Sequence, residues 1–329
     1  MTEKSSKLLA KARGTQDILP TRAILYQQVQ RVTQSILNNA GYQPIILPTY
    51  EYQELFTFSV GETTDIVQKE MFVFADRKGR QLVLRPEGTT SIVRLVCQNK
   101  LVNHGYPLRL YYWGSMFRYE RPQKGRYREF YQLGIELINA QGIMADGELL
   151  WLIKQIIQVF NLKKNAVLHW NYLGKPEIKE KYKIMLKEYL TNKLNELCLD
   201  CQKRYQLNPL RILDCKLCKP EKLPSYRKVL DEIDLAYLEE LAEFLDKSEV
   251  NHYHNENLVR GLDYYTGIVF ELLLVEDNEK SVILGGGRYD NLFQQLGGVN
   301  FPAAGFALGV DRLVDYLSSL DKKNKNAGV

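Results

Sequence analysis

The chain has 329 residues, 45% of them hydrophobic and 25% charged, which is typical of a globular protein with one or two domains. No apolar run approaches the roughly 20 residues that span a bilayer. The first residues, MTEKSSKLLAKARG, lack the apolar stretch of a secretory signal, so we expect a cytoplasmic protein with no membrane contact. The net charge of +5 permits a nucleic-acid partner but does not argue for one, because a mixed solvated surface gives the same total.

The first half of the chain alternates helical and strand patterns. Residues 21–40 carry apolar side chains at helical spacing and end before Gly41, which predicts a helix. MFVFAD and RQLVLRP flank a turn at residues 77–79 and predict a strand pair. Residues 108–120 and 128–138 alternate and predict a long antiparallel hairpin. Two further helices are predicted over residues 89–99 and 146–160.

The composition changes after residue 172. Residues 175–247 are rich in Lys, Glu and Leu and poor in glycine, which predicts helices. We therefore predict an α+β fold with one antiparallel-sheet domain flanked by helices, formed by residues 1–172 and 251–320. A mostly helical insertion at residues 173–250 interrupts this domain, and residues 321–329 form a polar tail.

The hairpin carries an unusual density of charge. Its central stretch FRYERPQKGRYREFYQLGIE, residues 117–136, holds four arginines between Arg118 and Arg128. A solvated tip is the commoner explanation for such a run, but here the arginines continue into both strands. Alternation places Arg118 and Glu120 on one face. One face of the return strand carries Gln132, Gly134 and Glu136. This polar face predicts a binding surface for an anionic ligand that also carries an amine.

The stretch resembles motif 2 of the class II aminoacyl-tRNA synthetases, and most closely that of the histidyl-tRNA synthetase family. Further segments resemble the family in the same order along the chain: KARGTQDILP, RPEGT, NPLRILDCK, LVRGLDYYTGIVFE, GGGRYD and GFALGVDRL. The resemblance covers residues 11–318. It implies a class II catalytic core that activates L-histidine with ATP to histidyl-adenylate and then transfers histidine to the 3′ end of tRNA(His).

The resemblance also implies roles for individual residues. Arg118 and Arg260 are the expected catalytic cations, and Arg260 takes a place that other class II enzymes give to a metal. ATP, entering with Mg²⁺, is expected to contact Arg118, Glu120, Arg126 and Arg312. Histidine is expected to contact Glu87, Thr89, Arg118, Gln132, Glu136, Arg260, Tyr264 and Tyr265. The tRNA acceptor end is expected at Arg121, Gln123 and Lys124.

Several of these residues also have an ordinary structural explanation. Glu87 suits the acidic first turn of a helix. Arg260 suits an ion pair with Asp263. Tyr264 and Tyr265 are adjacent, so only one of them faces the pocket if the segment is extended.

Four of the five cysteines form two C-x-x-C pairs, separated by 13 residues. The members are Cys198, Cys201, Cys215 and Cys218. This spacing predicts a structural zinc site in the insertion. Incidental thiols are the alternative, since disulfides are not favoured in the cytosol.

Two expectations concern the assembly of the chain. Residues 21–40 and the strand ending at Pro48 resemble motif 1, which implies a homodimer. Members of the family normally continue with an anticodon-binding domain, which we expect to be absent here. That absence raises an alternative function, the histidine-sensing regulatory subunit of ATP phosphoribosyltransferase, a paralogue of the synthetase. The intact ATP-binding arginines favour the enzyme, because a sensor does not need them.

Overall fold

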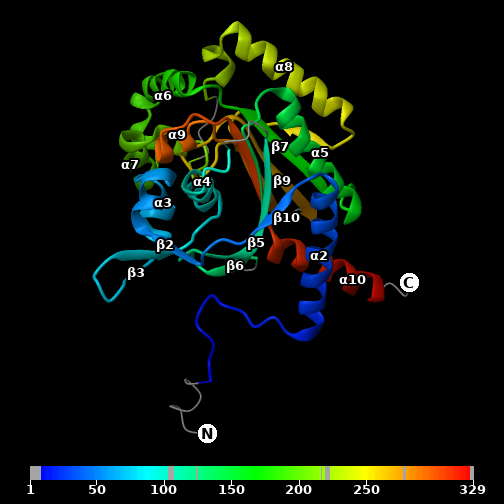
Figure 1. Ribbon diagram of the computed structural model, residues 1–329. Helices are drawn as coiled ribbons and strands as arrows, with labels where there is room; N and C mark the ends of the chain where they lie inside the picture. The colour runs from blue at the N-terminus through cyan, green and yellow to red at the C-terminus, as the bar shows by residue number, and fades with distance from the viewer. Residues whose placement is uncertain are drawn as a thin grey trace.

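The computed structural model describes residues 9–102, 107–123, 125–215, 217–218, 223–276 and 279–326, with side chains through residue 320 (Figure 1). An eight-stranded sheet lies at its centre, in the order β1-β5-β6-β11-β10-β9-β7-β8. Its strands are β1 (Gln43–Ile45), β5 (Leu108–Phe117), β6 (Glu129–Ile138), β7 (Ala166–Tyr172), β8 (His252–His254), β9 (Thr266–Glu276), β10 (Glu279–Arg288) and β11 (Ala303–Gly309). The inner pairings are antiparallel, as predicted, while the edge strands β1 and β8 pair in parallel with β5 and β7.

Both predicted strand pairs are confirmed. β5 and β6 pair along their whole length, from Leu108 opposite Ile138 to Phe117 opposite Glu129. The other pair belongs to a separate three-stranded sheet of order β2-β4-β3. Its strands are β2 (Tyr50–Tyr52), β3 (Phe72–Ala75) and β4 (Gln81–Leu84).

The helices fall largely where the apolar spacing predicts them. They are α2 (Pro20–Asn39), α3 (Gln53–Val60), α4 (Thr89–Gln98), α5 (Ile143–Val159), α6 (Pro176–Thr191), α7 (Leu199–Leu207), α8 (Glu232–Lys247), α9 (Leu292–Gly297) and α10 (Val310–Asn326). Short helical turns are η1 (Ile66–Glu70), η2 (Leu194–Glu196), η3 (Pro209–Ile212) and η4 (Tyr226–Val229). Helix α10 extends into the predicted polar tail, and residues 327–329 lie outside the described residues. Among the described residues, no helix combines the length and apolar character needed to cross a membrane.

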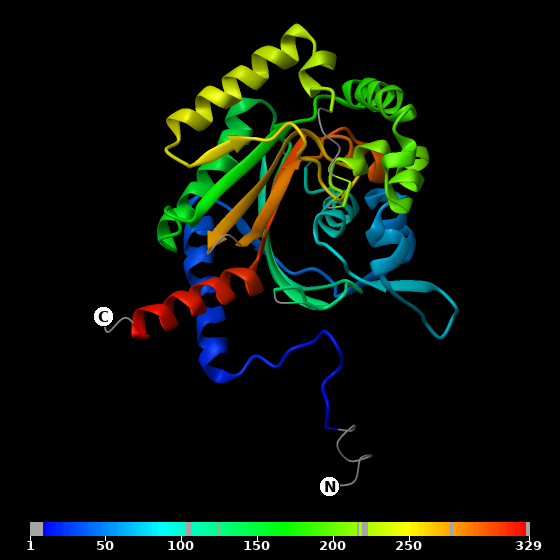
Figure 2. The same cartoon turned by 180° about the vertical axis from the view of Figure 1, so that it is seen from behind.

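Two hydrophobic layers cover opposite faces of the large sheet. Helices α2, α5, α8 and α10 lie on one face, and α3, α4, α6, α7 and α9 lie on the other (Figures 1 and 2). Strand alternation sends side chains to both layers, so Tyr111 packs in the first and Tyr112 in the second. The polar face of the β5–β6 hairpin therefore opens toward the layer of α4 and α6.

The described part of residues 173–250 contains helices and turns but no strand. Helices α6 and α7 pack on the second layer, whereas α8 returns to the first and lies against α5. The segment is anchored at its base, because the Leu173 N–H donates to the Gly267 carbonyl (2.7 Å) and the Gly267 N–H donates to the Gly174 carbonyl (2.9 Å). Its division from the core as a separate domain stays a prediction.

Candidate functional site

Glu136 is a buried acid at the centre of the polar face of β6, with 1% of its surface exposed. Its carboxyl group accepts hydrogen bonds from the Thr89 hydroxyl (2.8 Å) and the Tyr289 hydroxyl (2.5 Å). Burial raises the pKa of Glu136 to about 8; the charge of Glu87 adds to this shift, and the two hydroxyl groups oppose it. Without a bound ligand, the carboxyl group is therefore mostly protonated at neutral pH. The hydroxyl groups of Thr89 and Tyr289 can stabilise its anion by donating hydrogen bonds to it.

Glu87 lies beside it at the start of α4. Its two oxygens accept the backbone N–H groups of Thr89 (2.7 Å) and Thr90 (3.0 Å), so it caps the helix, although it lies just before the N-cap Gly88 and not in the first turn. Burial raises the pKa of Glu87, and these same hydrogen bonds oppose the shift. The Tyr264 hydroxyl lies 3.5 Å from Oε2, so Glu87 caps the helix and also contacts a tyrosine of the site.

Tyr264 and Tyr265 both contact residues of the site, Tyr264 through Glu87 and Tyr265 through Arg260. The prediction that only one would face the pocket depended on an extended segment, and here residues 262–265 form a turn before β9. Both rings are buried, with centroids 4.7 Å apart. Tyr264 meets Tyr289 edge to face at 5.9 Å, and Tyr265 lies 5.8 Å from the guanidinium carbon of Arg260. The two tyrosines therefore reach different parts of one site.

Tyr112 is a member of the site that the sequence analysis did not single out. Its buried ring lies against Gly88 and Gly134, where an added Cβ would overlap it. The charges of Glu136 and Glu87 add to the burial that raises its pKa. A glycine in the middle of a strand often marks the close approach of another group, so Gly134 is the signal that could have revealed Tyr112.

The side chain of Arg260, which precedes β9 in the chain, is held against β9 and β10. Its ion-pair partner is Glu271, so the proposed pairing with Asp263 is wrong. Its guanidinium group lies over Gly285, where a Cβ would overlap it. Its Nε is buried and has no hydrogen-bond partner among the described residues. A buried donor without a partner is rare in proteins and points to a bound ligand.

Three arginines gather beside the hairpin. Arg312, at the start of α10, donates to the carbonyl oxygens of Gly125 (3.0 Å) and Val282. Burial lowers the pKa of Arg312, and the charges of Arg126 and Arg118 lower it further. The three guanidinium groups thus form a cationic cluster from the end of β5, the hairpin tip and α10, which suits a polyphosphate.

The strand alternation predicted for Arg118 and Glu120 ends at Phe117. Beyond it the backbone bends, because the Glu120 N–H donates to the Arg118 carbonyl (2.8 Å). The Arg118 side chain donates to the Pro86 carbonyl (2.9 Å), and Glu120 forms an ion pair with Arg126 at 3.4 Å. The predicted sharing of one strand face by Arg118 and Glu120 is therefore wrong, although both lie near the arginine cluster.

The remaining predicted contact residues lie on β6 and at the tip of the β5–β6 hairpin. Gln132 has a buried Oε1 without a hydrogen-bond partner among the described residues, as expected for a group that awaits a donor. Arg121 and Gln123 are exposed at the hairpin tip. Lys124 lies outside the described residues.

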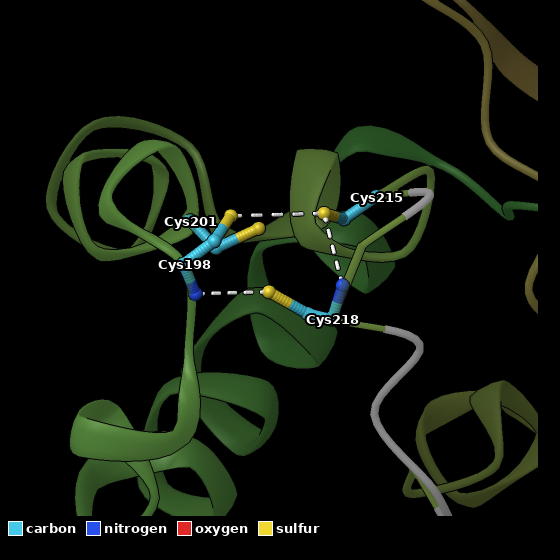
Figure 3. A group of neighbouring side chains, drawn as sticks. All are labelled: Cys198, Cys201, Cys215 and Cys218. Atoms are coloured by element: carbon cyan, nitrogen blue, oxygen red, sulfur yellow. Dashed lines mark hydrogen bonds between the residues drawn. The ribbon is translucent and has the colours of Figure 1, made fainter.

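The four predicted cysteine ligands converge at the start of α7 and in the loop after η3 (Figure 3). All four sulfur atoms lie within 4.8 Å of one another. Cys198 Sγ and Cys215 Sγ are 3.9 Å apart, close to the about 3.8 Å expected between thiolates around a tetrahedral zinc ion. Backbone N–H groups of Cys198 and Cys218 donate to Cys218 Sγ (3.0 Å) and Cys215 Sγ (3.4 Å). The donor set and its spacing fit zinc.

Comparison with known proteins agrees with this geometry. A family model described as histidyl-tRNA synthetase matches residues 14–313. The histidine–tRNA ligase of Aquifex aeolicus is 45% identical over 95% of this chain and 78% of its own. The crystal structure of apo S. aureus histidyl-tRNA synthetase is 33% identical, covers 94% of this chain and 74% of its own, and has a TM-score of 0.77. A Bacillus halodurans structure described as an ATP phosphoribosyltransferase regulatory subunit/histidyl-tRNA synthetase is 28% identical, covers 94% of this chain and 83% of its own, and has a TM-score of 0.69.

Proposed function

Because this chain belongs to the histidyl-tRNA synthetase family, we propose that it activates L-histidine with ATP and transfers the histidyl group to the 3′ end of tRNA(His). The observation that carries the proposal is that Glu87, the neighbour of Glu136, also lies near Arg118, a member of the arginine cluster with Arg126 and Arg312. Carboxylates that can bind an ammonium group thus lie next to arginines that can bind a polyphosphate, as an amino acid and ATP require.

In the proposed histidine site, the α-ammonium group binds Glu136, with Glu87, Thr89 and Gln132 around it. The unpartnered Oε1 of Gln132 supports this placement, because an ammonium donates three hydrogen bonds. Tyr264 and Tyr265 contact the imidazole ring. A buried polar group that is left unpaired by the wrong side chain gives strong discrimination between amino acids.

The first reaction is an attack of the histidine carboxylate on the α-phosphorus of ATP. A new oxygen–phosphorus bond forms, the bond to the β-phosphate breaks, and pyrophosphate leaves. Such a step needs alignment and positive charge rather than a covalent catalyst. We assign Arg118 and Arg260 to the carboxylate and α-phosphate, and the free Nε of Arg260 supports that role.

The rest of ATP lies along the arginine cluster in this proposal. Arg126 and Arg312 hold the terminal phosphates, and Glu120 is placed at the adenine or metal side. Mg²⁺ enters with ATP and neutralises phosphate charge, with few protein ligands of its own.

In the second reaction, a hydroxyl group of the terminal tRNA ribose attacks the histidyl carbonyl carbon and AMP leaves. Arg121, Gln123 and Lys124 are proposed to contact the acceptor end. The exposure of Arg121 and Gln123 supports this, because loops read single-stranded RNA ends. We propose a cytoplasmic location, since charged tRNA is consumed there by translation.

We further propose a homodimer built through α2, β1 and the small sheet. The support is a set of exposed apolar side chains just after β1, on the small sheet and on the adjoining α3: Ile46 (92% exposed), Tyr50 (56%), Tyr52 (51%), Phe58 (64%) and Phe74 (42%). Apolar surface of this kind usually marks an interface. Analytical ultracentrifugation should give twice the chain mass, and Ile46→Lys should shift the protein toward monomer. A monomeric parent would refute the dimer.

We also propose that the cysteine cluster holds a structural zinc ion. Cys198, Cys201, Cys215 and Cys218 would hold it, joining the start of α7 to the loop after η3. Elemental analysis should find about one zinc per chain, and Cys201→Ser should lose it and lower the unfolding temperature. Zinc-free protein purified from zinc-replete medium would refute the site.

The test of the main proposal is histidine-dependent ATP–pyrophosphate exchange with Mg²⁺, repeated with other amino acids. No exchange above background would refute it. A regulatory histidine sensor would bind histidine in calorimetry without exchange, so the same pair of measurements separates the alternative. Arg121→Ala is the matched control, because it should keep full exchange while it weakens tRNA charging.

A further inference from the structure

The turn that carries Tyr264 and Tyr265 is held by a lysine from outside the sheet. Lys179 lies in α6, and its Nζ donates hydrogen bonds to the carbonyl oxygens of Asp263 (2.8 Å) and Tyr265 (3.0 Å). These carbonyls stand on either side of Tyr264. One ammonium group therefore bridges both ends of the turn.

Other contacts also hold the segments on either side of this turn. The Asp263 carboxylate accepts hydrogen bonds from Asn208 (3.0 Å) and Thr63 (3.2 Å). Among the described residues, Lys179 is the only side chain that donates to the Tyr265 carbonyl. The second end leads directly into β9, where Thr266 pairs with Arg288, and Lys179 adds the hydrogen bond at Tyr265 itself, beside Arg260.

The packing of α6 does not require this lysine. The helix is attached to the second layer by a separate apolar stripe, formed by Ile178, Tyr182, Leu186 and Leu190. Burial lowers the pKa of Lys179 to about 8, although the charge of Asp263 opposes the shift. A buried ammonium is costly, but removing it would leave two carbonyl oxygens of the turn without their donor, which costs stability as well. The charge serves the turn, not the stability of the helix.

We propose that Lys179 is a positioning residue for histidine recognition, setting the rings of Tyr264 and Tyr265 against Glu87 and Arg260. The inference rests on the proposed function. Arg118, Arg126 and Arg312 come from the hairpin and α10, and the ion pair with Glu271 holds Arg260 on β9, so the groups assigned to ATP stay in place when the turn moves. Loss of the ammonium must then affect histidine far more than ATP.

The test compares three variants in the exchange assay. Lys179→Met should raise the KM for histidine about tenfold or more, since small misplacements of binding groups have effects of this size. The KM for ATP should change less than about twofold, and the unfolding temperature should fall by no more than a few degrees, since each lost hydrogen bond contributes about 1 kcal/mol. Lys179→Gln retains an amide donor and should recover part of the loss. Lys181→Met removes the same charge from an exposed position of the same helix and should behave like the parent.

An unchanged histidine KM in Lys179→Met overturns the inference. So does an equal rise in both KM values together with a lower unfolding temperature, which would mark a purely structural lysine. If Lys179→Met fails to unfold cooperatively, Lys179→Gln decides, and a parent-like histidine KM in that folded variant overturns the inference. If the parent itself shows no exchange, the proposed function fails, and histidine dissociation constants from calorimetry then test Lys179 in the same variants.

Discussion

Binding of histidine should displace a proton from Glu136. With a pKa of about 8, this carboxyl group holds its proton in about nine of ten free molecules at pH 7. A bound α-ammonium favours the carboxylate, so about 0.9 proton should leave per histidine at pH 7 and about 0.5 at pH 8. Ionising the group at pH 7 costs about 1.4 kcal/mol, which weakens histidine binding about tenfold relative to high pH.

Titration calorimetry in two buffers of different ionisation enthalpy measures this proton directly. The imidazole of histidine also titrates near neutral pH, and Glu136→Gln provides the correction because that contribution is shared. The parent should release about 0.9 proton more than the variant at pH 7. Its affinity for histidine should rise about fivefold from pH 7 to pH 8, while that of the variant stays nearly flat. Equal proton release by both proteins, or a flat pH profile in the parent, would refute the assignment of Glu136 to the amine.

Three further outcomes follow from the same site. Arg260→Ala should lower histidine-dependent exchange about 100-fold or more while calorimetry finds histidine affinity within about tenfold of the parent; a parent-like exchange rate would contradict its role. Glu87→Gln should raise the histidine KM and also lower the unfolding temperature by a few degrees, since the helix loses an acceptor worth about 1 kcal/mol; the assignment fails if the KM is unchanged. The free protein should unfold at a lower temperature at pH 9 than at pH 7, because the pKa of Glu136 is raised to about 8 and its neutral form, favoured in the fold, is lost as pH rises through that value. Glu136→Gln should remove part of this fall, and an identical fall in both proteins would contradict the assignment.

The sequence pattern was sufficient for the sheet and for the gathering of the motifs. Alternation predicted β5 and β6 because one face of each strand packs in the core, and the same alternation brought Gln132, Gly134 and Glu136 to one side. The C-x-x-C spacing likewise predicted the cysteine cluster, because the two cysteines of each pair lie close together along the chain.

Local sequence patterns could not predict the contacts that segments distant in the sequence make with the site. The turn at residues 262–265 exists because the Asp263 N–H donates to the Val60 carbonyl and Lys179 donates to two carbonyls of the turn. Nothing in the local sequence separates Lys179 from the other lysines around it. The pairing of Arg260 with Glu271 was missed for the same reason, because it depends on the path of the chain between them.

The last helix also has a consequence for how the protein is made. Helix α10 lies beside α2, where the Tyr26 hydroxyl donates to Asp311 at 2.6 Å, and the next residue, Arg312, joins the hairpin at Gly125 (Figure 1). A ribosome adding about 5–20 residues per second reaches Asp311 some tens of seconds after Tyr26. From the synthesis of β6 until that of β11, β6 lacks this neighbour, so the growing chain carries an open strand edge that invites aggregation. Nascent chains released before α10 should therefore depend on chaperones and bind no nucleotide.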